Sequence, residues 1–233
     1  MQDKRTAMVV GAHPDDPDFA VGGTVAKWAR DGWRMVYVVC TNGDKGSSDP
    51  EMTSERLAVL RDPEQRASAR VLGASDVEML GHPDGCLEDT IAFRGELVRL
   101  IRKYRPERVL AHDPHGRHPV HRDHRMAGMA TLDAVFPAAG NPMFYAEHRA
   151  EGLTPHKVKE VYLWGSEDPD TFVDISDVWD TKIKAVACHV SQVGDHSADW
   201  DTWIQQRKER AIAMSRRPDM PLSEAFRRVE LRW

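Results

Sequence analysis

Cysteine is scarce in this sequence, and the few cysteines do not form pairs. The 233 residues include three of them, Cys40, Cys86 and Cys188, and no CxxC pattern occurs. An odd and widely scattered set excludes a disulfide framework and a zinc site built from thiolates. Cys40 and Cys188 have apolar neighbours in the sequence, so we expect both to be small buried residues.

The sequence also lacks a long apolar run. Its first residues, MQDKRTAMVVGAHPDD, contain only a short apolar stretch between charged positions. Such a stretch is too short for the core of a signal peptide or for a membrane span. We therefore expect no membrane span and a protein that stays in the reducing cytoplasm.

A basic excess is absent as well. Lys and Arg number 32 against 37 Asp and Glu, which gives a net charge of −5. Surfaces that bind phosphate backbones usually carry a positive excess, so the composition argues against a nucleic-acid partner. Glycines at positions 22 and 23 follow GAHPDD, but neither GxGxxG nor GxxxxGK[ST] occurs there, which disfavours a nucleotide-binding loop.

What is present fits one soluble α/β domain over residues 1–233. Hydrophobic residues make up 41% of the chain, enough for one sizeable core. No repeat or linker divides the sequence, and strand and helix patterns alternate. This alternation is typical of a mostly parallel sheet.

The patterns predict six strands and six helices. The expected strands are residues 6–12, 34–40, 77–80, 108–111, 158–163 and 172–175. The expected helices are residues 21–31, 62–72, 91–104, 121–136, 177–189 and 200–215. For the second helix we expect Asp62 as N-cap and Pro63 at the first helical position. The segments 41–54 and 138–156 are expected to be loops.

Two polar motifs follow two of the expected strands. HPDD comes after the first strand and HRDH follows the fourth. Because sites in open α/β sheets form where strands end, we expect these motifs to meet at one edge of the sheet. Histidine nitrogens and carboxylate oxygens suit zinc, and three protein ligands leave a position open for water. We assign His13, Asp16 and His124 as the three ligands.

Each motif alone has a simpler interpretation. HPDD could be a proline turn with capping carboxylates, and the two histidines of HRDH could lie on a solvated first helical turn. Their joint occurrence after two parallel strands favours the metal site. Further histidines, His112, His115 and His118, come just before at three-residue spacing. We expect these three on a loop surface, although a histidine-rich tract can also bind metal without catalysis.

The sequence resembles the PIG-L/LmbE-like zinc N-deacetylases. The resemblance is carried, in the family's order, by AHPDDPDFAVGGTVAKWARDGW, TNGDKG, EQRASARVLGA, LGHPDG, HRDHR and KIKAVACHVSQ. These segments extend over roughly residues 6–192. The resemblance implies a Rossmann-like fold with helices on both faces of the sheet and one zinc ion per chain. It also implies hydrolysis of N-acetyl groups on N-acetylglucosamine-type small molecules.

By match to the family's motifs, His13, Asp16 and His124 would bind the metal and Asp15 would act as general base. His121 would stabilise the oxyanion. The chemistry agrees with these roles. Zinc lowers the pKa of its water towards about 7, which makes that water the nucleophile. Asp15 can take the proton of this water and return it to the leaving amine, and a protonated His121 would offer a positive charge to the oxyanion.

Other residues receive supporting roles. Asp123 is expected either to orient a ligand histidine or to be an exposed carboxylate of the first helical turn. Arg61, Glu64 and Asp84 lie where the family places substrate-binding groups, and ion pairs or turn capping are equally good interpretations. His189 matches a late histidine that enters the site in some family members, in certain cases from a neighbouring subunit; the alternative is a histidine favoured by the end of a helix.

The leading hypothesis is therefore a zinc-dependent deacetylase of an amino-sugar-containing small molecule. An amidase that cleaves a larger N-acyl group or a thiol-conjugate amide at the same site is the alternative. Two other classes are a nucleotide-binding protein, in which HPDD only closes a turn, and a metal-storage or sensor protein. The sequence leaves open which amino sugar is recognised and whether the chain forms a homo-oligomer.

Overall fold

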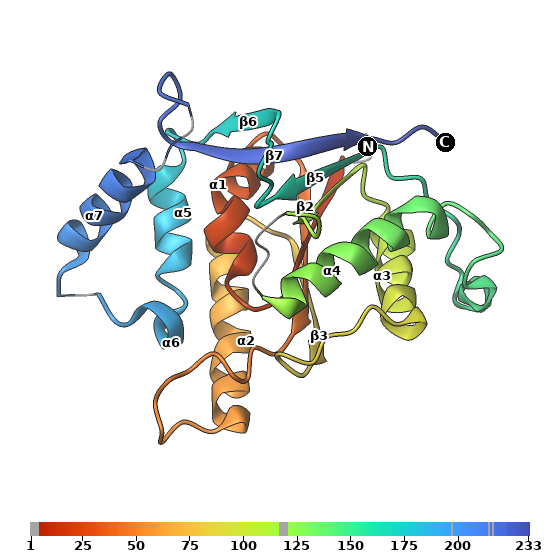
Figure 1. The fold of residues 1–233 in the computed structure, drawn as a ribbon, viewed down its shortest axis with the longest axis horizontal. Coiled ribbons are helices and arrows are strands. Elements are labelled where there is room, and N and C mark those ends of the chain that lie inside the picture. Colours follow the sequence, from red (N-terminus) through yellow and green to blue (C-terminus); the bar gives the residue numbers. More distant parts are fainter. Residues whose placement is uncertain (1–4, 117–120, 197, 214, 216) are drawn as a thin grey trace.

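A computed structural model describes residues 5–116, 121–196, 198–213, 215 and 217–233. Its centre is a seven-stranded sheet with the strand order β3-β2-β1-β4-β5-β7-β6. Helices cover both faces of this sheet (Figure 1). The expectation of a Rossmann-like α/β fold with a mostly parallel sheet is confirmed.

Five strands form the parallel part of the sheet. They are β1 (Thr6–Gly11), β2 (Arg34–Thr41), β3 (Asp76–His82), β4 (Arg108–His112) and β5 (Glu160–Trp164). Strand β1 is buried along its whole length, between β2 and β4. Its apolar run, TAMVVG, matches a strand covered on both faces. The chain leaves β1 towards β2 and β3 and later returns to β4 on the other side, so the switch point of the topology lies between β1 and β4.

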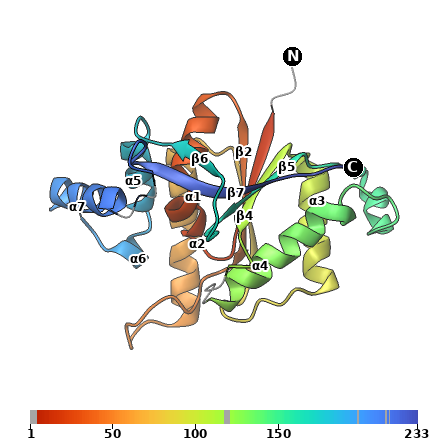
Figure 2. The ribbon, with the colours of Figure 1, turned by 45° about the horizontal axis from the view of Figure 1, so that its top comes forward.

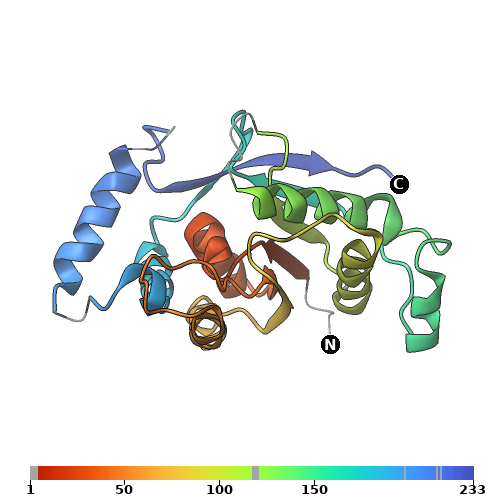
Figure 3. The same cartoon turned by 60° about the horizontal axis from the view of Figure 1, so that its bottom comes forward.

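Two hydrophobic clusters fix the helices to the two faces. On one face lie α1 (Asp16–Arg30), α2 (Ser54–Val71) and α5 (Trp179–Val186); on the other lie α3 (Ile91–Tyr104) and α4 (Arg122–Asp133). Figure 3 shows these two groups on either side of the strands. Both helix layers bury their apolar stripes against the sheet, the usual solution for an α/β domain.

The remaining elements are short or peripheral. They are the π-helical turn η1 (Ala134–Ala138), the 3₁₀ helix η2 (Ala146–Glu151), α6 (Val190–Val193) and α7 (Trp200–Ala213). Helix α7 lies at the outer end of the molecule, far from α3 and α4 (Figure 2). Among the residues that the structure describes, no helix has both the length and the apolar character needed to cross a bilayer.

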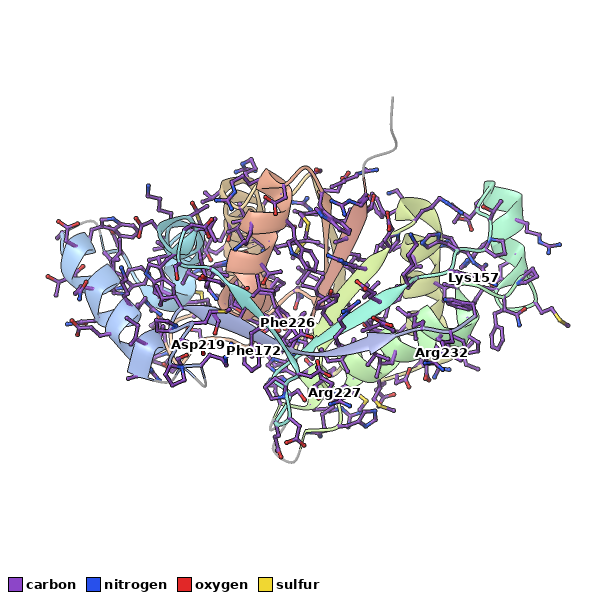
Figure 4. All side chains as sticks on the ribbon, turned by 90° about the horizontal axis from the view of Figure 1, so that it is seen from above. Lys157, Phe172, Asp219, Phe226, Arg227 and Arg232 are labelled. Atoms are coloured by element: carbon purple, nitrogen blue, oxygen red, sulfur yellow. The ribbon has the colours of Figure 1, made fainter. Side chains whose placement is uncertain are left out.

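The last strand along the chain is not among the strands predicted from the sequence. Strand β7 (Ser223–Glu230) pairs antiparallel with β5 and with β6 (Thr171–Asp174). Figure 4 shows it with Phe226 and Arg227 along its length. Its sequence, SEAFRRVE, is polar, yet Phe226 is fully buried and Glu224 is buried in an ion pair with Lys182. The partner of Glu224 is distant in the chain, so the sequence pattern could not reveal the strand.

Two helix starts differ from the expectation. Helix α2 begins at Ser54, capped by the Thr53 hydroxyl, and Pro63 lies inside it, so the prediction of Asp62 as N-cap is wrong. Proline lacks only one helical donor, and Pro63 is exposed, so the helix continues through it. Helix α1 begins at Asp16, earlier than expected, because Pro17 suits a first helical turn.

The cysteine predictions are right in one case and wrong in another. None of the three cysteines is in a disulfide. Cys40 is buried on β2 as expected, whereas Cys188 is only partly buried, since it lies at the end of α5 beside the short α6.

Arg102 of α3 organises the segment after α4. It is 3% exposed, and its guanidinium donates hydrogen bonds to the carbonyls of Ala138, Ala139, Asn141, Phe144 and Tyr145. We expect Arg102→Met to lower the free energy of unfolding by about 3 kcal/mol, because several of these carbonyls lose their donor.

Denaturant unfolding monitored by circular dichroism measures this effect. The control is Arg99→Met on the same helix, which removes an exposed ion pair with Glu151 and should cost less than about 1 kcal/mol. Equal losses in the two variants would show that Arg102 does not hold the segment.

Candidate active site

The two polar motifs meet at the carboxyl ends of β1 and β4. His13, Asp15 and Asp16 follow β1 directly, and His112 is the last residue of β4. His124 lies on the first turn of α4. The site therefore occupies the switch point of the sheet, where ligands bind in open α/β folds.

A tight turn separates the two adjacent carboxylates. Asp15 has φ 90° and ψ −34°, and it precedes the first residue of α1. The amide of Asp16 donates to the carbonyl of His13 across this turn. As a result the carboxylate of Asp16 turns towards a group of histidines, whereas that of Asp15 lies 3.1 Å from Nη2 of Arg61.

Three histidine rings surround Asp16. Its Oδ2 lies 3.2 Å from Nδ1 of His13 and 3.3 Å from Nε2 of His112, and its Oδ1 lies 3.3 Å from Nε2 of His124. Burial alone would raise the pKa of Asp16, but the hydrogen bonds from these rings hold it well below its usual value. The carboxylate is ionised, as a metal ligand must be.

The other edge of the His13 ring faces two more carboxylates. Its Nε2 lies 3.1 Å from Oδ1 of Asp84 and 3.2 Å from Oδ2 of Asp123. Burial lowers the pKa of His13, but the hydrogen bonds and charges of Asp16 and Asp84 outweigh this effect and raise it to about 10. Without a metal His13 is therefore protonated, and it must release a proton before a ring nitrogen can bind an ion. A ligand histidine whose second nitrogen bonds a carboxylate is the usual arrangement at metal sites.

Asp123 is fully buried, so the exposed interpretation of this residue is wrong. Besides His13, it accepts hydrogen bonds from the backbone amides of Gly85 and Leu87. Asp123 thus joins α4 to the loop after β3 and holds the His13 ring between the two.

These side chains fit a divalent ion. Zinc ligands about 2.0–2.1 Å from a tetrahedral ion are about 3.3 Å from one another, close to the separations around Asp16. Three groups of potential ligands lie within 4.8 Å: His13 with His121 and His124, Asp16 with His112 and His124, and His13 with Asp84 and Asp123. The triple assigned from the sequence is not itself one of these groups. Asp16 lies 3.2 Å from His13 and 3.3 Å from His124, and His13 and His124 occur together in the group with His121, so the triple stays a prediction.

The prediction of a surface loop is wrong for His112. Its side chain is buried, and its Nδ1 accepts a hydrogen bond from the indole of Trp164 while its Nε2 faces Asp16. His112 is the last residue of β4 and lies beside β1, a position that the loop-like sequence around it concealed. His115 is exposed as expected, and His118 lies outside the described residues.

His121 is an exposed residue at the rim of the site. Its Nδ1 accepts a hydrogen bond from the amide of Asp123 as the N-cap of α4, and its ring lies 4.4 Å from that of His13. Partial burial and the neighbouring His13 and His124 lower its pKa. The expectation of a protonated His121 is therefore not supported. In the neutral ring with Nδ1 accepting, the proton is on Nε2.

Arg61 is buried and bonded within the protein. It lies next to the Asp15 carboxylate and donates to the backbone carbonyls of Pro14 and Gly43. Burial raises the pKa of Asp15 to about 6, and the charge of Arg61 limits this rise. A carboxylate with a pKa near neutrality is suited to general base catalysis.

The other expected substrate-binding residues have partners of their own. Glu64 accepts hydrogen bonds from the amide and hydroxyl of Ser191 in α6. Asp84 faces His13 and accepts from the amide of Lys45. His189 is fully buried, with its Nε2 2.9 Å from Oδ2 of Asp18. Through these bonds Glu64 holds α6 and Asp84 holds the loop at Lys45, and His189 has no exposed surface to offer a substrate.

Binding of a divalent ion should stabilise the folded chain. At zinc concentrations of about 100 times Kd we expect a gain of about 2.7 kcal/mol, or about 5–10 °C in Tm for a chain of this size. Calorimetry of chelated and zinc-reloaded protein measures the shift. An unchanged Tm, or the same shift in His124→Ala, would contradict a folded-state site at these residues.

An ionised carboxylate among histidines, beside a second carboxylate with a raised pKa, is a group of side chains able to hold a divalent ion and to transfer a proton at the edge of a Rossmann-like sheet. Residues 8–135 match the family model described as "PIG-L: GlcNAc-PI de-N-acetylase". The chain belongs to this family. The match includes both polar motifs and all the histidines around Asp16.

A relative and a solved structure show what this chain is similar to. It is 37% identical to a diacetylchitobiose deacetylase of Thermococcus kodakarensis over 86% of this chain and 74% of the relative. Its fold matches the N,N'-diacetylchitobiose deacetylase of Pyrococcus horikoshii with a TM-score of 0.88 and 29% identity, over 98% of this chain and 85% of the other.

A further relative has a different printed activity. It is a 4-oxalmesaconate hydratase of Pseudomonas putida, 31% identical over 91% of this chain and 82% of the relative. Likeness over most of the chain therefore extends to proteins with more than one reaction, and the reaction of this chain must be argued from its site.

Proposed function

We propose that this protein is a zinc-dependent deacetylase that removes the acetyl group from an N-acetylglucosamine-type small molecule. The observation that carries the proposal is that the neighbouring carboxylates of Asp15 and Asp16 have different surroundings. Asp16 faces His13, His112 and His124, while the carboxylate of Asp15 next to it lies beside Arg61. One carboxylate is thus available to hold an ion and the other to handle protons. The named deacetylases support the choice of substrate class.

His13, Asp16 and His124 would hold the zinc ion, which when bound acidifies water and polarises the amide carbonyl. Asp15 accepts the proton of the attacking water as the carbon–oxygen bond forms. The same carboxyl group then gives this proton to the departing nitrogen as the carbon–nitrogen bond breaks. The products are acetic acid, which keeps the second proton of the water until it ionises to acetate in solution, and the free amine, and Asp15 is ionised again.

His121 would stabilise the oxyanion as a neutral donor. Its Nδ1 is occupied by the amide of Asp123, so the Nε2–H is the group available to the developing negative charge. A fixed hydrogen-bond donor aimed at an oxyanion stabilises the transition state without needing a positive charge. This differs from the protonated ring expected from the sequence.

Acetate release from a panel of N-acetylglucosaminides that differ only in the group at the anomeric position tests the proposal. We expect zinc-dependent release from at least one member, and the preferred member narrows the substrate. A second, matched panel of compounds with longer acyl chains and of thiol-conjugate amides tests the alternative that the protein is an amidase. Activity on this second panel alone would contradict the deacetylase and support the amidase. Inactivity on both, together with hydration of an unsaturated dicarboxylate, would overturn the proposal.

A further inference from the structure

A buried amide links the turn of Asp15 to the helix layer behind it. The backbone amide of Asp15 donates to Oε1 of Gln65, 2.7 Å away, and Nε2 of Gln65 donates to Oδ2 of Asp18, 2.8 Å away. Gln65 and Asp18 are both fully buried. Gln65 comes from α2 and Asp18 from α1, so one side chain connects two helices and the turn between β1 and α1.

The orientation of this amide is fixed at both ends. Asp18 is held by His189, whose Nε2 lies 2.9 Å from Oδ2, and by the Tyr37 hydroxyl, which donates to Oδ1. The Asp18 carboxylate can only accept from Gln65, and the Asp15 amide can only donate to it. A reversed amide would place two donors together at one end and two acceptors at the other.

The Asp15 turn needs such a support. A φ of 90° is uncommon for a residue with a side chain, and such backbone conformations persist only where their surroundings hold them. In this conformation the Asp15 carboxylate lies 3.1 Å from Nη2 of Arg61, whereas the Asp16 carboxylate lies among the histidines. If the Asp15 amide lost its acceptor, the turn could relax and the carboxylate would move relative to the metal ligands.

We propose that Gln65 is a positioning residue for catalysis: through the Asp15 amide and Asp18 it holds the Asp15 carboxylate in its working direction. This inference rests on the proposed role of Asp15 as general base. Gln65 is fully buried, and among the described residues its side chain bonds the Asp15 amide and Asp18, so we expect its effect in the proton-transfer step. A buried hydrogen bond of purely structural importance would instead alter stability and leave the turnover of the folded enzyme unchanged.

The first test is Gln65→Met, which keeps the volume and removes both hydrogen bonds. Because misplacing a catalytic group by about 1 Å can cost about 100-fold, we expect kcat to fall by about 30- to 100-fold. KM and the zinc content per folded chain should stay within about twofold of the parent. Ser68→Ala, also buried on α2 and with a hydroxyl that has no partner among the described residues, is the matched control and should keep kcat.

A pair of substitutions at positions 65 and 18 provides the second test. Gln65→Glu places a second carboxylate next to that of Asp18, and because the two repel each other we expect kcat to fall. Adding Asp18→Asn exchanges the donor and the acceptor, because the asparagine amide can donate to the carboxylate introduced at position 65 while that carboxylate still accepts from the Asp15 amide. The second hydrogen of this amide can go to Nε2 of a neutral His189 ring that carries its proton on Nδ1, an atom with no other partner among the described residues. We expect kcat of the double variant to be at least about tenfold higher than that of Gln65→Glu, from restored positioning. If Gln65→Met does not fold, this pair decides the proposal alone, and absence of recovery in folded protein would overturn it.

Variants made in an Asp15→Ala background distinguish the general-base role of Asp15 from the positioning role of Gln65. If Asp15 is the base and Gln65 acts through it, Gln65→Met should not lower the residual rate of Asp15→Ala further. An active Asp15→Ala enzyme would refute the proposed role of Asp15. An inactive Asp15→Ala enzyme together with an unchanged kcat in Gln65→Met would refute the positioning role only.

Discussion

Replacing Asp15 by alanine should leave zinc binding intact and lower kcat by about 1,000-fold or more, within the upper range for loss of a general base. The reason is geometric. The Asp15 carboxylate lies beside Arg61, whereas its neighbour Asp16 is the carboxylate that faces the histidines. Deacetylation kinetics measured together with zinc content by atomic emission would separate the two effects.

Asp62→Ala serves as the control, because this partly exposed α2 carboxylate is paired with Arg66 and lies outside the site. It should keep full activity and zinc. Normal turnover by Asp15→Ala with one zinc ion bound would show that a different group moves the proton. Loss of zinc in Asp15→Ala would instead place Asp15 among the metal ligands.

Replacing His124 by alanine should have the opposite signature: loss of most bound zinc and, with it, of activity. His124 lies 3.3 Å from Asp16 and is the only histidine of the assigned triple that comes from α4. Three-ligand sites lose most of their affinity when one ligand is removed, because the remaining donors no longer enclose the ion. Titration of apoprotein with zinc against a competing chelator gives the affinity.

His115→Ala is the matched control, since His115 is exposed in the loop after β4 and should bind zinc normally. His112→Ala adds information that the sequence could not supply. His112 also contacts Asp16, so a loss of zinc affinity as large as that of His124→Ala would add it to the ligand set beside His124. Unchanged zinc affinity in His124→Ala would contradict the assigned triple.

The parts of the fold that can be predicted from the sequence are those whose patterns are local. Helix α3 agrees with its prediction at both ends, and strands β1 to β5 lie within two residues or so of the expected ranges, because apolar runs and capping residues mark them directly. The predicted range for helix α2 is too short, because Pro63 is typical of a helix start. Strand β7 escapes prediction because its polar residues are buried by partners distant in the chain.

Part of the site could also be predicted, because two of its segments have local sequence patterns. HPDD and HRDH are short motifs after strands, and the parallel sheet brings them together without further information. The burial of His112 and the link through Gln65 depend on how β4 and α2 pack, so no local pattern reveals them. The loop prediction for 41–54 holds for residues 42–53, because Thr41 ends β2 and Ser54 begins α2, whereas the segment 138–156 contains the short helix η2 and is not all loop. We expect the choice of amino sugar to depend on side chains of such connections, whose directions no local pattern gives.

The most direct test of the account is the position of the metal in a crystal of zinc-loaded protein, located by anomalous scattering at the zinc edge. We expect one strong site, with ligand atoms of His13, Asp16 and His124 about 2.0–2.2 Å from the ion and the Asp15 carboxylate outside its coordination sphere. An ion held by His13, Asp84 and Asp123 instead, or no ordered ion in the folded protein, would contradict it.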